Sequence, residues 1–311
     1  MNAPAEQSEI ALSVVVVAHD MERELPRTLR SLACPYQRNI YPDDYEIVVV
    51  DNGSSVPLEA VLPAGAEASV SLHRIEGAAV SPVRAANQGI SLARGAVVGL
   101  IIDGARMVSP GLLAGALRGA AVAQRPVVTA PAWHLGPGVS ALAEGAGYDE
   151  AAEDELLEQA GWESDGYGLF SIATPAASSA RGLFGAMGES SSLFLHRQTW
   201  DQVGGLDDRF ALPGGGMVNH DLYRRVCALD DAQLVVLLGE GTFHQTHGGA
   251  ATSGRLTSEE MRADYEAICG HPHRPPLNQP LFLGSVTRAY LPYIAASIDA
   301  AQRVGQADAG P

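Results

Sequence analysis

The sequence contains no lysine: all 20 basic residues among its 311 are arginine. This absence excludes sites built on a lysine amine, which include Schiff-base enzymes, P-loop nucleotide-binding proteins and protein kinases. Cysteine is also scarce, and Cys34, Cys227 and Cys269 form neither a disulfide framework nor a zinc-binding pattern. We therefore expect a protein of a reducing compartment, the cytoplasm.

Two further absences concern membranes and nucleic acids. No apolar run reaches the roughly 18 residues that a membrane-spanning helix needs, and residues 1–9 show no signal-peptide pattern. The net charge of −16 and the lack of basic clusters argue against a nucleic-acid partner. We expect a soluble protein, and 311 residues suffice for one large α/β domain or two smaller ones.

An apolar run that ends at Asp103 organises the chain. Residues 97–102 have the pattern of a buried central strand, and Asp103, Gly104 and Arg106 follow it. The strand would deliver Asp103 to the carboxyl edge of a sheet, where open α/β sheets bind their ligands. A carboxylate there suits a divalent cation or a ribose hydroxyl. The alternative is that Asp103 merely caps a turn.

The segments before this run have the pattern of βαβ units. Residues 12–18 and 45–50 are β-branched runs typical of buried strands, and residues 69–74 form a weaker candidate. Ser81 and Pro82 open a helix, the serine as its N-cap and the proline at its first position. This alternation predicts a doubly wound, mostly parallel central sheet flanked by helices.

The pattern is less regular beyond residue 130. Residues 131–188 show one short acidic helix, over 150–159, within a stretch rich in glycine, serine and alanine. Long irregular segments inside compact domains are commonly functional, and we interpret this one as a mobile loop. Other elements are expected over 110–124 (helix), 126–130, 191–196, 234–238 and 242–247 (strands or extended), and 219–228, 261–269 and 288–300 (helices).

Taken in order, these segments resemble the family 2 glycosyltransferases, enzymes with the GT-A fold, from about Leu12 to Gly249. Each piece alone is common, but the ordered set at this spacing is specific. The pieces are Ser13-Val14-Val15-Val16-Val17, Glu46-Ile47-Val48-Val49-Val50-Asp51-Asn52-Gly53-Ser54-Ser55, Asn87-Gln88-Gly89-Ile90, Ala93-Arg94-Gly95, Ile102-Asp103, Gly204-Gly205-Leu206-Asp207-Asp208-Arg209-Phe210 and Asp221-Leu222.

The resemblance implies a Rossmann-like GT-A domain with a smaller acceptor-side subregion and a helical C-terminal tail. Residues 1–107 would be the nucleotide-sugar-binding half, and residues 108–250 the acceptor-binding and catalytic half of the same domain. Residues 251–311 would be a helical C-terminal extension, which either packs on the acceptor side or mediates a homodimer. The irregular segment would then lie on the acceptor side.

The resemblance also implies roles for residues at the donor nucleotide. Ala18, His19 and Asp20 would line the base and the ribose. Asp51 would accept a hydrogen bond from the base imide, which suits uridine. Arg84 lies near the position of a family residue that neutralises the diphosphate, although Ala86 stands where the arginine is usual.

The metal site departs from the family pattern. Asp103 would be the first aspartate of the Asp-X-Asp motif, but Ala105 replaces the second, and a hard cation such as Mn²⁺ or Mg²⁺ wants more than one oxygen ligand. His244 or His247 would complete the site, since some GT-A enzymes use a histidine from this region. Their i, i+3 spacing on an extended segment predicts that only one reaches the metal, and His244 is preferred. Alternatively, Arg106 neutralises the diphosphate without a metal.

The general base is the second departure, because Asn219 occupies the usual position of the catalytic aspartate. Asp221, His220 and Glu189 are the remaining candidates for a base that deprotonates the acceptor. Asp221 has an alternative interpretation, a helix-start carboxylate paired with an arginine one turn later. For Glu189 the alternative is a solvated loop carboxylate.

Two functions follow from these features. The first is a transferase that moves a sugar, with inversion, from a nucleotide-sugar donor, UDP-linked, to a hydroxyl of a small-molecule or carbohydrate acceptor. The second is a non-catalytic sugar-nucleotide-binding protein on the same fold, which the departures at Ala105 and Asn219 favour. A Rossmann dehydrogenase or methyltransferase is excluded because the first strand-to-helix turn, residues 18–22, contains no glycine.

Overall fold

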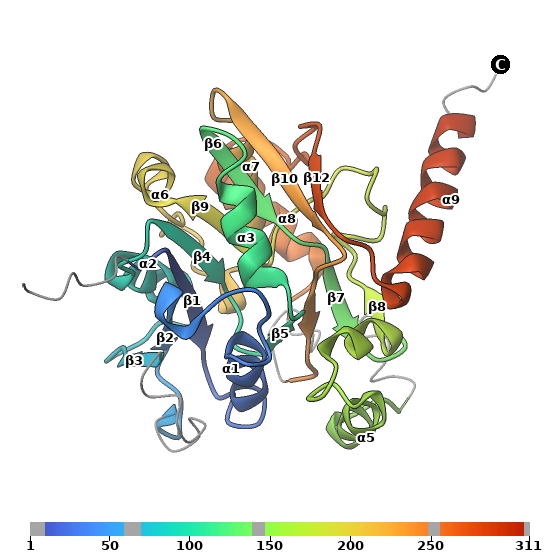
Figure 1. The fold of residues 1–311 in the computed structure, drawn as a ribbon. Coiled ribbons are helices and arrows are strands. Elements are labelled where there is room, and N and C mark those ends of the chain that lie inside the picture. The colour runs from blue at the N-terminus through green and yellow to red at the C-terminus, as the bar shows by residue number, and fades with distance from the viewer. Residues whose placement is uncertain (1–9, 59–69, 139–146, 248–255, 308–311) are drawn as a thin grey trace, which may run out of the picture.

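The computed structural model describes residues 10–58, 70–138, 147–247 and 256–307, and an eight-stranded sheet forms its centre (Figure 1). The strands lie in the order β12-β10-β6-β9-β4-β1-β2-β3. Neighbours are parallel except at β9, which runs antiparallel to both β4 and β6. The expected mostly parallel sheet is confirmed. The bounds are β1 Leu12–Ala18, β2 Tyr45–Asp51, β3 Val70–Arg74, β4 Val97–Ile101, β6 Arg125–Thr129, β9 Leu193–His196, β10 Ala232–Leu238 and β12 Leu281–Gly284.

The central strands form because they are apolar runs buried on both faces. All seven residues of β1 are buried, and alternate residues serve opposite faces: Val15 and Val17 pack in one hydrophobic cluster, Val14 and Val16 in the other. Helices α2, α6 and α7 contribute to the first cluster, and α1 and α3 to the second. Their bounds are α1 Leu25–Leu32, α2 Val83–Leu92, α3 Leu112–Ala120, α6 Arg197–Val203 and α7 Val218–Cys227.

A second, smaller sheet continues three of the central strands beyond their carboxyl ends. Its order is β5-β11-β7-β8. β5 follows β4, β7 follows β6 and β11 follows β10, each after a short turn. These turns therefore gather at one edge of the central sheet. The bounds are β5 Arg106–Val108, β7 Ala132–Leu135, β8 Ala173–Pro175 and β11 Thr242–His244.

The segment over residues 131–188 contains more structure than its sequence predicts. It includes β7, β8, the expected acidic helix α5 (Glu150–Ala160) and the 3-10 helix η3 (Gly166–Ser171). Asp149 caps α5 with its side chain. The expectation of one long irregular loop was wrong, although residues 139–146 lie outside the described part of the chain.

The C-terminal region is attached to the sheet as well as helical. The expected helices are present as α8 (Ser258–Cys269) and α9 (Leu291–Ala307), and between them the unpredicted strand β12 pairs with β10 (Figure 1). Tyr293 of α9 packs edge-on against Trp133 of β7, with ring centroids 4.6 Å apart. The region is thus no purely helical tail. Short 3-10 helices are η1 Pro42–Asp44, η4 Pro213–Gly215 and η5 Arg288–Tyr290.

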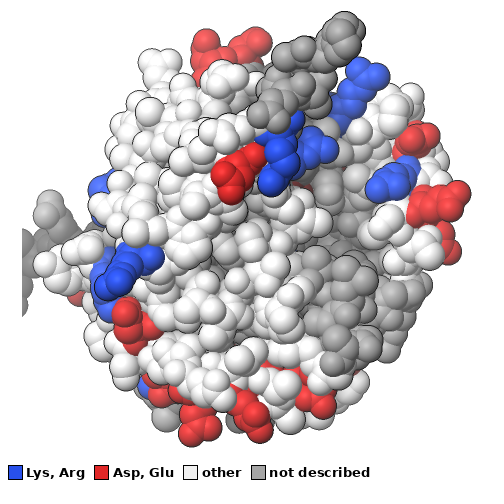
Figure 2. All heavy atoms as spheres, turned by 90° about the vertical axis from the view of Figure 1, so that its right-hand side faces the viewer, with Lys and Arg blue, Asp and Glu red and all other residues white. Residues whose placement is uncertain are grey.

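Two surface properties bear on the expectations from composition. Among the described residues no helix has the length and apolar character needed to cross a bilayer. On the face shown in Figure 2, arginine side chains stand in small groups, mostly near acidic ones, and leave wide neutral areas. The described residues on this face form no broad basic surface, in keeping with the net charge of −16.

Candidate active site

Three side chains converge at the carboxyl edge of the central sheet. Asp103 lies in the turn between β4 and β5, His244 ends β11, and His247 follows it. Asp103 Oδ2 lies 2.8 Å from His244 Nε2 and 3.4 Å from His247 Nε2, and the two Nε2 atoms are 3.0 Å apart. All three candidate ligand atoms lie within 4.8 Å of one another. We call Asp103, His244 and His247 the site trio.

Backbone contacts orient the carboxylate of Asp103. Its Oδ1 accepts a hydrogen bond from the Ala105 N–H at 2.9 Å, which leaves Oδ2 for the histidines. The turn passes close to the end of β1, since a Cβ on Gly104 would lie 2.8 Å from the Cβ of Ala18. Ala18 is therefore part of the wall beneath the turn. Ala105, at the second motif position, contributes a backbone donor instead of a carboxylate.

Both histidines reach the carboxylate of Asp103, so the strand alternation on which the prediction of a single metal-ligating histidine rested was wrong. The strand β11 ends at His244, and the backbone N–H of Gln245 donates to the carbonyl of Ala105 at 2.9 Å. The alternation of side chains ends with the strand. His247 consequently turns back to the same carboxylate.

Burial and charge determine the protonation of the site trio. Burial alone would raise the pKa of Asp103, but His247 and His244 hold it well below its usual value. Burial, followed by the charge of Arg106, lowers the pKa of His244 to about 4. For His247 burial acts in the same direction, but the Asp103 carboxylate outweighs it and raises the pKa. His244 therefore presents a neutral imidazole at neutral pH.

A third histidine, His134, lies against the ring nitrogen of His244 that faces away from Asp103. His134 Nδ1 lies 3.4 Å from His244 Nδ1, and burial, followed by His244, lowers the pKa of His134 to about 3. If the Nε2 lone pair of His244 faces a cation, its Nδ1 carries the proton and donates to His134. Such an outer partner is usual for a metal-bound imidazole. His134 was not among the predicted site residues.

The donor atoms of the site trio fit a divalent transition metal. Imidazole nitrogens are ligands of first-row transition metals, so this set of two nitrogens and one oxygen fits Mn²⁺ better than Mg²⁺, which prefers an all-oxygen set. Arg106 lies opposite His244 in the β5–β11 register. Its Nε is buried and has no hydrogen-bond partner among the described residues. The site therefore combines a place for a cation with a free N–H donor for an anion such as a diphosphate.

Asp51, expected to contact a base, is buried and engaged on both oxygens. Its Oδ2 lies 2.6 Å from Arg74 Nη1, and its Oδ1 accepts a hydrogen bond from the Ser54 N–H at 2.7 Å. A base would reach this carboxylate only after Arg74 had moved away. Arg74, which the sequence did not single out, has a side chain 33% exposed against 1% for Asp51.

The other residues predicted to contact the donor nucleotide lie in different surroundings. Asp20 has a left-handed backbone with φ +49°, and its carboxylate accepts a hydrogen bond from the Ser55 N–H at 2.6 Å, which ties the ends of β1 and β2 together. Arg84 is exposed on α2 and makes no polar contact with the site trio. A cavity of about 320 Å³ is lined by His19, Asn52, Gly53, Arg74, Ile75, Glu76, Gly77, Ala78, Ala79 and Val80.

The candidate bases fall into two environments. Asp221 has a side chain only 4% exposed, with Oδ2 at 2.6 Å from Arg225 Nε and Oδ1 at 3.3 Å from Arg224 Nη2. Glu189 and His220 are 26% and 28% exposed, and Glu189 Oε2 lies 3.6 Å from His220 Nδ1. The open carboxylate is thus Glu189, whereas Asp221 is enclosed by two arginines.

A histidine from the C-terminal region completes the second environment. The ring of His273 lies edge-on to that of His220, with centroids 5.0 Å apart. Burial, followed by the charge of His220, lowers the pKa of His273 to about 4. The sequence did not indicate His273, because His273 follows α8 and lies about 50 residues after His220 in the chain.

Comparisons with known proteins agree with this architecture. The family model for Glycosyl transferase family 2 matches residues 13–115, and no curated protein matches the chain. The crystal structure of S. aureus TarS 1-349 in complex with UDP-GlcNAc is 13% identical, with a TM-score of 0.54 over 84% of this chain and 66% of that one. The mannosyltransferase PcManGT from Pyrobaculum calidifontis, in complex with GDP-Man and Mn²⁺, is 13% identical, with a TM-score of 0.52 over 96% of this chain and 75% of that one.

The extent of the likeness differs between these proteins. The chain spans 66% of the TarS fragment and 43% of the longer TarS structure. At this identity the solved structures bear on the fold, and the family model bears on the sequence of the first strands and helices. Residues 13–115 thus match the model of glycosyl transferase family 2, and the architecture of the chain is the GT-A fold of the solved glycosyltransferases.

Proposed function

We propose that the chain transfers a sugar from a nucleotide-sugar donor to a hydroxyl of a small-molecule or carbohydrate acceptor, with a divalent cation held by the site trio. The observation that carries the proposal is the convergence of Asp103, His244 and His247 within 4.8 Å at the strand ends. Structural relatives in complex with UDP-GlcNAc and with GDP-Man and Mn²⁺ support it. The donor set favours Mn²⁺ over Mg²⁺.

Each residue of the site has a chemical task in this proposal. A bound cation would neutralise negative charge on the leaving diphosphate. The unpaired Nε of Arg106 would donate a hydrogen bond to the same group, where charge develops in the transition state. The Ala105 N–H holds Asp103 so that Oδ2 stays directed at the histidines.

The base in this proposal is Glu189, with His220 beside it. An inverting transfer needs a base that removes the acceptor proton while the new C–O bond forms and the bond to the diphosphate breaks. Glu189 and His220 are both about a quarter exposed and lie 3.6 Å apart. The oxygens of Asp221 already accept from two arginines, which supports a structural role there.

Uracil is the nucleobase of the donor to be tested first. Asp51 would accept its imide N–H if Arg74 turned from the carboxylate into the adjoining cavity, which it already lines. Guanine is the alternative, because Arg74 and Glu76 at the cavity would suit its carbonyl acceptor and its amine donors.

Calorimetric titration with UDP and with GDP, in Mn²⁺, in Mg²⁺ and in EDTA, tests the donor and the cation together. We expect binding of one nucleotide that is tightest in Mn²⁺ and weakened by His244→Ala. Binding that is equally tight in EDTA would contradict the proposed cation site. Arg106 alone would then neutralise the diphosphate. Release of nucleotide from the sugar donor in the presence of Mn²⁺ separates the transferase from a non-catalytic binding protein, which would hold the nucleotide without turnover.

A further inference from the structure

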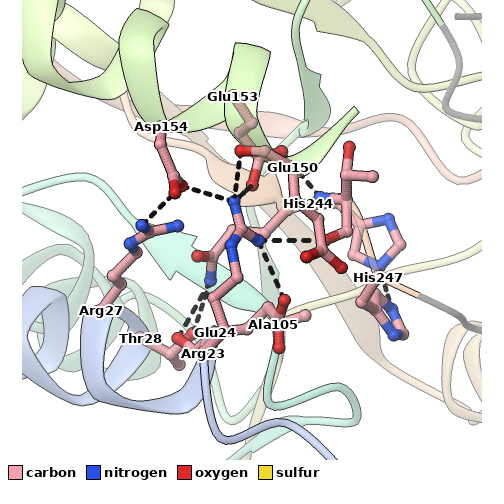
Figure 3. A network of polar contacts seen from close by, with 12 residues as sticks. Arg23, Glu24, Arg27, Thr28, Ala105, Glu150, Glu153, Asp154, His244 and His247 are labelled. Carbon is pink, nitrogen blue, oxygen red and sulfur yellow. Dashed lines mark hydrogen bonds and ion pairs between the residues drawn. The ribbon is translucent and has the colours of Figure 1, made fainter. Parts of the chain in front are cut away.

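A network of polar contacts lies beside the site trio and connects three separate segments. Figure 3 shows Arg23, ahead of α1, reaching toward Glu153 and Asp154 of α5, close to the segment that carries His244 and His247. We propose that Arg23 and Glu153 form a clamp that positions the metal ligand His247, so that α5 controls the affinity of the site for its cation. This inference rests on the proposed cation site.

The clamp holds the residue immediately before His247. Glu153 Oε2 accepts a hydrogen bond from the Thr246 N–H at 2.7 Å, and Arg23 Nη1 donates to the Thr246 carbonyl at 3.2 Å. Both polar backbone groups of Thr246 are therefore fixed by side chains from other elements. His247 lies three residues beyond the end of β11 at His244, so β11 does not fix its position. The position of its ring depends on how Thr246 is held.

The two clamp residues make further ion pairs, and Glu153 is buried. Glu153 is fully buried, and Arg23 Nη2 donates to its Oε1 at 3.2 Å and to Asp154 Oδ1 at 2.6 Å. Arg23 Nη1 also donates to Glu24 Oε1 at 2.9 Å. A second arginine, Arg27, shares the Asp154 oxygen at 2.7 Å. The Arg23 guanidinium is thus held by several partners besides Glu153. Because the guanidinium is fixed, it also fixes the position of the Glu153 carboxylate.

A buried ion pair is an expensive way to dock a helix, because desolvation of the charges can exceed their attraction. Apolar residues would attach α5 to α1 at lower cost. The pair does what apolar side chains cannot: it accepts from one backbone group of Thr246 and donates to the other. Outer partners of this kind orient metal ligands, and their loss typically weakens metal binding.

The test is the Mn²⁺ affinity of the full chain, measured by the electron paramagnetic resonance signal of free Mn²⁺. Glu153→Ala removes the acceptor of the Thr246 N–H but leaves Arg23 paired with Glu24 and Asp154, and we expect Mn²⁺ to bind about 10-fold more weakly or worse. Glu153→Gln keeps the size and one acceptor oxygen, and we expect a smaller loss. Glu163→Gln is the matched control, because Glu163 also pairs with α1, through Arg30 at 2.9 Å, but is 52% exposed.

A double-mutant cycle with His247→Ala separates positioning from general stability. If the clamp acts through His247, Glu153→Ala changes Mn²⁺ affinity by no more than about twofold once His247 is gone, which is within the scatter of independent sites. A full loss in that background would overturn the clamp, and so would Mn²⁺ binding by Glu153→Ala equal to that of the control. If Glu153→Ala does not fold, Glu153→Gln decides in the same way, with a loss larger than the control's supporting the clamp.

The outcome for the wild-type protein distinguishes the two proposals. Wild-type binding of Mn²⁺ together with an unaffected Glu153 variant overturns the clamp alone. Failure of the wild-type protein to bind Mn²⁺ overturns the proposed cation site, and the clamp with it.

Discussion

Replacing Asp221 should damage stability and replacing Glu189 should damage turnover. In Asp221→Asn, Arg224 and Arg225 lose the carboxylate that lies 3.3 and 2.6 Å from them in a side chain only 4% exposed. Breaking a buried ion pair costs about 3–5 kcal/mol. Arg225 keeps two carbonyl acceptors, on Val203 and Gly205, at 2.8 Å each, so the lower end, about 3 kcal/mol, is appropriate.

The assay is thermal unfolding of each variant beside its rate of sugar transfer per folded molecule. A loss of about 3 kcal/mol lowers the Tm of a 311-residue domain by roughly 5 °C, because the entropy of unfolding is about 2.1 cal/mol/K per residue. Glu189→Gln, at a quarter-exposed site, should cost under about 0.5 kcal/mol but slow transfer by about 10²–10⁴-fold. Asp207→Asn is the control, since its partner Arg209 is 64% exposed and such pairs contribute little.

The opposite pattern would refute this reasoning. An Asp221→Asn variant with an unchanged Tm and no turnover would identify Asp221 as the base. A Glu189→Gln variant that transfers sugar at the wild-type rate would remove Glu189 from the chemistry.

Three further predictions concern other described residues. His244→Ala should weaken Mn²⁺ binding at least about tenfold in calorimetry, since it removes a ligand and the partner of His134; unchanged binding would contradict the site. Burial raises the pKa of Glu240, so the folded chain binds its proton more tightly than the unfolded chain. The unfolding free energy therefore falls as pH rises through that raised pKa, and Glu240→Gln should flatten this slope in urea titrations at a series of pH values. Burial raises the pKa of Cys227 to about 12, so iodoacetamide at pH 8 should label it only after unfolding, as mass spectrometry can verify.

The sequence predicts elements best where burial on two faces dictates composition. Strands β1, β2 and β4 are continuous apolar runs, and they appear within a residue or two of the expected bounds. The strands that escaped prediction have three or four residues and no periodicity, as in Ala132–Leu135 and Leu281–Gly284. They exist because a partner strand lies beside them, which depends on tertiary structure.

The residues of the candidate site likewise include some that a local pattern predicts and some that only tertiary contacts bring into place. Asp103 is predictable because it ends a buried strand, but the approach of His247 depends on the hydrogen bond from Gln245 to Ala105, between segments far apart in the chain. Arg74, His134 and His273 lack any local pattern that joins them to the site. A cytoplasmic location and a homodimer remain predictions.

The strand β9, which runs antiparallel to its neighbours in the central sheet, determines which fragments of this protein could fold alone. One edge of β4 pairs with β1, within the stretch that matches the family model, but the other pairs with β9, which lies well downstream. The fit is close, since a Cβ on Gly99 would lie 2.4 Å from the ring of Phe194. A fragment ending after residue 115 would expose an apolar strand edge, which tends to pair with other chains. The stretch most easily recognised in the sequence is therefore not an autonomous folding unit, and during synthesis its sheet stays open until β9 has been made.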